Sequence, residues 1–281
     1  MTTTELTGTG PLVAVTADEL AALAWVFDAD AVVVEGPTIL EEVGEHRGAV
    51  AGSLLLSLAA KGVVDLDASE GEPRLRPVPE LPSLPAQVTS PDRWIRLHRA
   101  DEHGRRTRHL LAHEDEWLVM DVVGGLHVLA ASTAADVRRL AATALDISPP
   151  EDRTDGPDPW PSPPAGGSRS DLWACGPAGG RLSGRWRRWR DALAPTPHAA
   201  VRVDLTALVD GTLAYDWFTV LASDRTWWLS QPDPDAMVED PSLLGDEAAP
   251  AITDRIDAAV LLALLRAWLP EDQTSDALPP S

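Results

Sequence analysis

Apolar residues recur at intervals of three and four positions in several stretches of the chain, a spacing typical of amphipathic helices. A first helix is predicted to begin at Thr16, whose hydroxyl would form a capping box with Glu19 three residues later. A second helix is predicted over residues 47–61, with Gly62 following as a C-terminal cap. A third is predicted over residues 133–145.

Polar and apolar residues alternate between the second and third predicted helices, a pattern typical of half-buried β-strands. The strands predicted there cover residues 93–99, 107–113, 116–123 and 126–131. Gly124 and Gly125 form a two-residue hairpin loop between the last two.

Short β-branched runs predict two further strands, at residues 31–34 and 63–66. The prolines of residues 71–91 instead predict an extended connector without regular hydrogen bonding.

A similar order of elements returns near the C-terminus. Strands are predicted over residues 199–206, 212–222 and 226–229, and an amphipathic helix over residues 252–269. Because strands, a hairpin and a closing helix occur twice, we predict an α+β fold of two quasi-equivalent halves, each an antiparallel meander plus helices.

Domain boundaries follow from the same pattern and from proline and glycine content. We predict an N-terminal α/β half (1–147), a Pro/Gly-rich linker (148–170), a C-terminal α/β half (171–270) and an acidic disordered tail (271–281). A short arginine-rich helix is predicted at residues 181–193, after the linker.

The formal net charge is -21, from 44 acidic and 23 basic residues. Phosphate binding requires clustered bases, and the field of so acidic a protein repels nucleic acid and an anionic membrane surface. We therefore expect a neutral or locally basic protein as the partner.

Compartment is predicted from three sequence features. Cys175 is the single cysteine, so no internal disulfide forms, which fits a reducing environment. The first ten residues lack a basic region and an apolar run, so we expect no signal peptide. No apolar run reaches the ~18 residues of a membrane span, and we expect a cytoplasmic protein.

Seven histidines raise the question of a metal site. His109 and His113 lie in a predicted strand, where four residues span about 13 Å. Zinc ligands must lie about 2 Å from the ion, so this spacing favours ordinary strand histidines. We predict no metal site.

Catalytic motifs are also missing from the sequence. The glycine-rich stretch after Cys175 lacks the Lys-Ser/Thr of a phosphate-binding loop, and no Gly-x-Ser-x-Gly elbow occurs. We expect a non-enzymatic protein with no cofactor and no catalytic residues. Catalytic groups can assemble from scattered positions, so an enzyme without a recognisable motif stays an alternative.

Two clusters of basic residues stand out against the acidic whole. They comprise Arg93, Arg96, Arg99, Arg105, Arg106 and Arg108, and Arg181, Arg185, Arg187, Arg188 and Arg190 with Trp186 and Trp189. Arg and Trp are favoured interface anchors, which indicates partner binding. Internal ion pairing with the chain's own acids is the alternative, and the sequence does not decide between them.

The order of elements resembles the EspG family, the cytosolic chaperones of type VII secretion in actinobacteria. The resembling stretch runs from about residue 16 to residue 145. It includes Asp-Glu-Leu at 18–20, Leu-Leu-Leu-Ser-Leu-Ala-Ala-Lys-Gly-Val-Val-Asp at 54–65, Ser-Pro-Asp at 90–92, His-Leu-Leu-Ala-His at 109–113, Gly-Gly at 124–125 and Ser-Thr at 132–133.

This resemblance implies a mixed α/β fold of two similar halves. It also implies cytosolic binding of a helical secreted protein, PPE-like or WXG-like, whose apolar tip is shielded. By position, the contact would involve residues 100–106 and 252–269. The partner-binding residues that we predict are Arg99, Arg105, Arg106, Arg185, Trp186, Trp189, Ile256, Val260 and Leu264.

A regulatory protein is the second alternative. Residues 47–66 read as helix, glycine and strand, the ending of a winged helix, but they carry only Arg47 and Lys61 as bases. Oligomeric state is not predicted.

Overall fold

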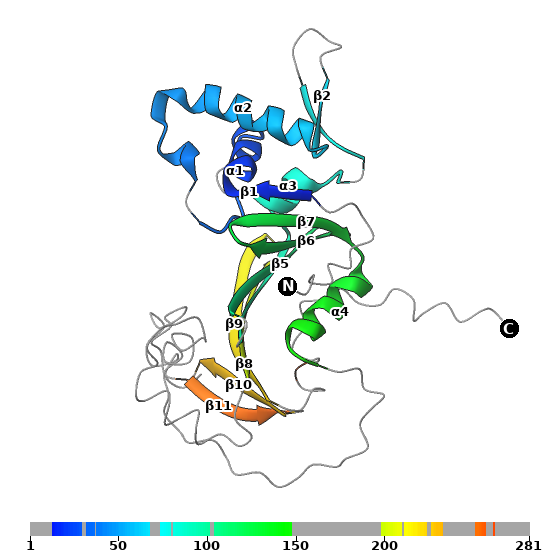
Figure 1. Ribbon diagram of the computed structural model, residues 1–281. Coiled ribbons are helices and arrows are strands. Elements are labelled where there is room, and N and C mark those ends of the chain that lie inside the picture. The colour runs from blue at the N-terminus through cyan, green and yellow to red at the C-terminus, as the bar shows by residue number, and fades with distance from the viewer. Residues whose placement is uncertain are drawn as a thin grey trace, which may run out of the picture. The chain divides into compact units, whose positions relative to one another are not determined.

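The computed structural model describes residues 13–29, 32–36, 38–67, 74–79, 81–101, 104–147, 198–209, 211–223, 226–232, 251–256 and 261. These residues form a mixed α+β fold with a large antiparallel sheet (Figure 1), as the sequence predicts. None of the described helices is long and apolar enough to cross a bilayer.

The helices within the described residues are α1 (Ala17–Val26), α2 (Arg47–Ala60), α3 (Leu84–Thr89) and α4 (Ala134–Ala144), with the short 3-10 turns η1 (Ile39–Glu41) and η2 (Gly44–His46). The strands are β1 (Val13–Thr16), β2 (Val64–Asp67), β3 (Arg74–Pro77), β4 (Arg93–Asp101), β5 (Gly104–His113), β6 (Glu116–Val123), β7 (Leu126–Ser132), β8 (Ala199–Val209), β9 (Thr212–Ser223), β10 (Thr226–Pro232) and β11 (Ala251–Ile256).

The large sheet has nine described strands in the order β1-β7-β6-β5-β4-β8-β9-β10-β11, and β2 and β3 form a separate pair. The hairpin β6–β7 closes where Val123 faces Leu126, so Gly124 and Gly125 are its two loop residues. Their φ angles of +59° and +84° are the left-handed values that a tight hairpin requires. This loop confirms the sequence prediction.

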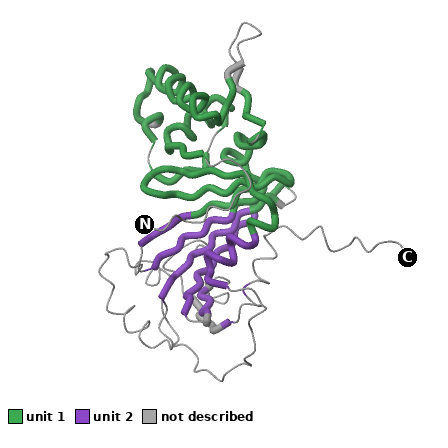
Figure 2. The backbone as a smooth tube through the Cα atoms, turned by 45° about the vertical axis from the view of Figure 1, so that its right-hand side comes forward, with its two compact units in different colours: residues 1–94, 108–137, 207–213 green, residues 95–107, 138–206, 214–281 purple. Residues whose placement is uncertain are grey.

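The chain divides into two compact units that interleave in sequence (Figure 2). Unit 1 comprises residues 1–94, 108–137 and 207–213; unit 2 comprises residues 95–107, 138–206 and 214–281. The predicted boundaries at 147, 170 and 270 stay a prediction, because residues 148–197 and 262–281 lie outside the described part of the chain.

In unit 1, α1 begins with the predicted capping box. The Glu19 backbone N–H donates to Thr16 Oγ1 (3.1 Å), and the Thr16 N–H donates back to Glu19 Oε2 (2.8 Å). Helix α2 matches its prediction to within one residue and is followed by Gly62 at φ +67°. Local capping therefore determines where α1 begins and where α2 ends.

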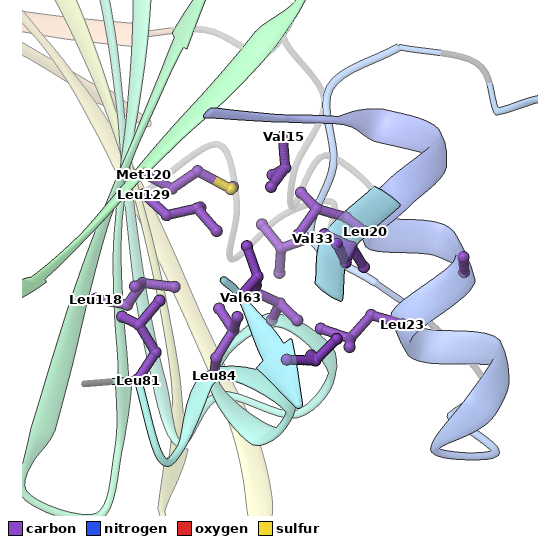
Figure 3. Packing of buried hydrophobic residues seen from close by; sticks show 14 of the residues in the cluster. Val15, Leu20, Leu23, Val33, Val63, Leu81, Leu84, Leu118, Met120 and Leu129 are labelled. Atoms are coloured by element: carbon purple, nitrogen blue, oxygen red, sulfur yellow. The ribbon is translucent and has the colours of Figure 1, made fainter. Parts of the chain in front are cut away.

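The core of unit 1 lies between the sheet and helices α1 to α3. Figure 3 shows Leu118, Met120 and Leu129 directed from the sheet toward Leu20 and Leu23 of α1. All five are at most 1% exposed, and burying each such side chain is worth about 1.5–3 kcal/mol.

Two predictions in unit 1 were wrong. Residues 32–34 form no strand; Val33 is buried in the core, and its N–H donates to the carbonyl of Val88 (2.7 Å). β-Branched residues favour a packed surface, which Val33 finds without a neighbouring strand.

The expected connector at 71–91 contains β3, which pairs with β2, and helix α3. Pro85 lies in the first turn of α3, where a missing N–H removes no helical hydrogen bond. Pro77 ends β3 in a two-stranded pair, a position that tolerates proline.

The predicted helix at 252–269 was wrong at its start. Residues Ala251–Ile256 form β11, which pairs antiparallel with β10 and places Ile256 opposite Trp227. Residues four apart share a face in a strand as well as in a helix, so the four-residue spacing did not distinguish the two. Leu261 is helical and buried; the other residues beyond 256 are not described.

Candidate partner-binding surface

The first basic cluster lies on the hairpin β4–β5, and its arginines divide into two groups. Arg96, Arg99 and Arg108 form internal ion pairs, whereas Arg93 and the pair Arg105 and Arg106 are exposed. Internal ion pairing therefore holds for Arg96, Arg99 and Arg108, whereas partner binding by the exposed arginines stays a prediction.

Arg99 ties the end of α4 to strand β4 within unit 2. Its Nε lies 2.8 Å from Asp101 Oδ2, and its Nη1 lies 2.9 Å from Asp146 Oδ1 and donates to the Ala144 carbonyl. Burial lowers the pKa of Arg99, but Asp146 and Asp101 outweigh it, so the guanidinium stays charged. The arrangement is structural, and a contact of Arg99 with a partner stays a prediction.

Arg105 and Arg106 are the exposed bases at the start of β5. Neighbouring residues of a strand point to opposite faces, so the two guanidinium groups flank the hairpin on both sides. Gly104, at φ +119°, precedes them in a conformation that other residues rarely adopt.

A buried carboxylate, Asp204 on β8, organises one face of unit 2. It is 4% exposed and accepts hydrogen bonds from Arg96 Nε (3.1 Å), Arg202 Nε (2.9 Å) and the Tyr215 hydroxyl (3.1 Å). Burial and the negative charge of Asp204 raise the pKa of Tyr215, so its hydroxyl is the donor. Side chains of β4, β8 and β9 are thereby joined at one carboxylate.

Two neighbours stiffen this Asp204 network. The Arg202 guanidinium carbon lies 4.8 Å from the ring centre of Trp217, a cation–π contact. His98 Nδ1 lies 2.9 Å from Thr107 Oγ1 across the hairpin. Strand β4 is thus fixed by the Arg96–Asp204 contact, and the His98–Thr107 contact joins it to β5, the strand that carries Arg105 and Arg106.

The remaining predicted contact residues lie outside the β4–β5 hairpin. Ile256 ends β11 and is half-buried, in a strand where a helix was expected. Arg185, Trp186, Trp189, Val260 and Leu264 lie outside the described residues. Their roles in partner binding stay predictions.

Exposed apolar side chains form a feature that the sequence did not reveal. The last residues of α1 and its C-cap, Trp25, Val26 and Phe27, are 45%, 37% and 40% exposed. Exposed aromatic residues of this kind are common interface anchors.

Within the part of the chain that the structure describes, no group of three or more His, Cys, Asp or Glu side chains could hold a metal ion.

No protein-family model matches this chain, and no curated protein matches it either. Its fold is similar to the solved structure of the Mycobacterium tuberculosis type VII secretion system chaperone EspG5 in complex with the PE25–PPE41 dimer. The similarity has a TM-score of 0.50 at 13% sequence identity and covers 92% of this chain and 97% of the other. At this identity, the likeness concerns the fold.

Proposed function

We propose that this protein is a cytoplasmic, non-catalytic chaperone or adaptor of the EspG type, which binds a helical type VII secretion substrate, PPE-like or WXG-like. The observation that supports this proposal is the fold similarity to EspG5, which extends over 92% of the chain. The proposal keeps the two quasi-equivalent halves, which the antiparallel meanders of β4–β7 and β8–β10 support.

The exposed arginines of the β4–β5 hairpin provide the contact in this proposal. Arg105 and Arg106 lie on β5, which follows β4 in the hairpin, and β4 is fixed by the Asp204 network and by the Arg99–Asp146 pair. Binding a partner there costs little conformational entropy of the hairpin, because the hairpin is already held in place. Such preorganisation favours affinity. The acidic remainder of the protein repels polyanions and favours a neutral or locally basic protein as the partner, whose neutral or acidic side chains would meet these bases.

Affinity purification of the full chain from its native host tests the proposal. We expect a small helical secreted protein to co-purify, and mass spectrometry identifies it. Reversing one charge, as Arg105→Glu or Arg106→Glu, is expected to weaken the recovered complex about tenfold, because hot-spot residues contribute more than about 1 kcal/mol.

Arg93→Glu is the matched control. Arg93 is also an exposed arginine, at the opposite end of β4 from the turn that precedes Arg105, and is expected to leave the complex unchanged. Recovery of no helical secreted protein would refute the proposed function. Equal affinity of all three variants would refute the contact alone.

A DNA-binding regulator is the second candidate, favoured by one observation. Helix α2 is followed by the hairpin β2–β3, the succession of a winged helix. However, Lys61 Nζ is engaged by Glu19 at 2.6 Å, and Arg76 of β3 faces Asp65. A gel-shift assay against genomic fragments at low salt is expected to show no complex, and a shifted band would favour this candidate.

A further inference from the structure

Two histidines are completely buried in unit 1, although neither belongs to the contact surface above. His109 of β5 and His127 of β7 are both 0% exposed. Leu111 and Leu129, two residues further along the same strands, belong to the hydrophobic core, so both imidazoles lie on the core face of the sheet. An imidazole in such a place must have its protonation state set by its neighbours.

His127 holds the segment of residues 32–36. Its Nε2 accepts the backbone N–H of Glu35 at 3.0 Å, so Nε2 carries no proton and Nδ1 does. Nδ1 is buried and has no hydrogen-bond partner among the described residues. A second proton would go to Nε2 and break the bond to the Glu35 N–H, while the buried N–H at Nδ1 would still lack an acceptor.

His109 is bound in the complementary way. Its Nδ1 accepts the indole N–H of Trp94 at 3.0 Å, and an indole nitrogen is only a donor. The unprotonated nitrogen is thus Nδ1, and Nε2 lies 3.4 Å from Glu35 Oε1. Both histidines face Glu35, one through its backbone and one through its carboxylate.

The charges around His127 favour its neutral form. Burial lowers the pKa of His127, and nearby His109 lowers it further, against the opposing effect of Glu35. β1 carries no titratable residue, and Val15 is paired with His127. On β6, Val122 lies opposite His127, while Asp121 is bonded to Arg108.

We propose that His127, supported by His109, is a pH-operated latch on residues 32–36: the neutral imidazole holds the Glu35 N–H, and protonation releases the segment. With the folded pKa below the unfolded value, the latch contributes stability above the ordinary histidine pKa of about 6.5 and loses it as the pH falls. The released segment is bounded by Val33, whose backbone N–H stays bonded to the Val88 carbonyl.

Amide hydrogen exchange of the full chain, corrected for the intrinsic rate, tests the latch. Peptides containing Glu35 are expected to lose about tenfold in protection between pH 7.5 and pH 5.5, while peptides of α2 keep theirs. In His127→Gln, whose amide oxygen can accept the same N–H but does not titrate, the protection is expected to be independent of pH.

Three results would overturn the latch: no loss of protection at Glu35, the same loss in His127→Gln, or a uniform loss that includes α2. If His127→Gln does not fold, long-range ¹⁵N–¹H spectra of the wild type replace it. They are expected to show an unprotonated Nε2 on His127 at pH 7.5 and a titration that coincides with the loss of Glu35 protection. Separate midpoints would contradict the proposal.

Discussion

Lys61 is the only lysine of the chain, and the other 22 of the 23 basic residues are arginines. Its Nζ lies 2.6 Å from Glu19 Oε2. Glu19 is 3% exposed and also accepts the Ser57 hydroxyl at 2.7 Å. A compact ammonium group, unlike a planar guanidinium, satisfies this carboxylate as a point charge. One ion pair thus joins α1 to the end of α2.

Lys61→Ala is expected to lower the free energy of unfolding by about 2–3 kcal/mol, because it leaves the buried Glu19 carboxylate without its cation. Urea denaturation followed by circular dichroism measures the change. Arg93→Ala, which removes an exposed base, is the control and is expected to change stability by less than about 0.5 kcal/mol. Equal effects of the two substitutions would show that the Glu19–Lys61 pair contributes nothing.

The same pair predicts a dependence on pH. Burial raises the pKa of Glu19, but hydrogen bonds from Lys61, Ser57 and Thr16 outweigh it and hold the pKa below its ordinary value. The folded pKa is therefore below the unfolded value of about 4.3, so the stability is present above that pH and is lost as the pH falls.

Unfolding free energies measured between pH 6 and pH 3 check this sign. The wild type is expected to lose stability more steeply below about pH 4.3 than Glu19→Gln does, because glutamine does not titrate. Parallel curves for the two proteins would mean that Glu19 has the same pKa folded and unfolded.

At the scale of the element, local signals decided the helices and hairpins. Capping at Thr16 and the glycines of the β6–β7 turn act within a few residues, so α1 and the hairpin β6–β7 were predictable. β11 and α3 were not, because a neighbouring strand and a proline in a first turn changed what the local pattern favoured. The environment of the predicted contact residues depends on distant positions as well. Arg105 is exposed, but Arg99 forms an ion pair with Asp146, which lies 47 positions further along the chain.

Helix α2 offers a matched pair of glycine substitutions. Gly52→Ala, with no atom within 4 Å of the added Cβ, is expected to stabilise the protein by about 0.5–1 kcal/mol through helix propensity. Gly62→Ala, at φ +67°, is expected to destabilise it by about 1–2 kcal/mol. Thermal unfolding of both variants measures the difference, and a change of the same sign in both would contradict the described cap.

At the scale of the whole molecule, net charge is the dominant property. The 44 acids and 23 bases leave a formal charge of -21, so like charges repel one another in the folded state. This repulsion opposes the compact state while keeping copies of the protein apart. It acts through long-range fields, unlike the short ion pairs at Glu19 and Asp204.

Salt is therefore expected to stabilise the protein. Raising NaCl from 50 mM to 500 mM should raise the thermal midpoint by about 2 °C or more, because screening weakens surface repulsion more than it weakens buried pairs. Differential scanning fluorimetry measures the shift, and KCl in place of NaCl provides the control. A midpoint that falls with salt would show that attractive surface pairs outweigh the repulsion.

The sequence by itself determined the helices with caps, the hairpins with glycine turns, the mixed fold class and the acidic character, because these depend on neighbouring residues or on simple sums. Only the tertiary structure decided which arginines are exposed, that Asp204 and Glu19 are buried, and that residues 251–256 form a strand. Those outcomes depend on partners tens of positions away, such as Arg96 for Asp204 and Lys61 for Glu19. Spacing along the chain carries no information about such distant contacts, because packing alone brings them together.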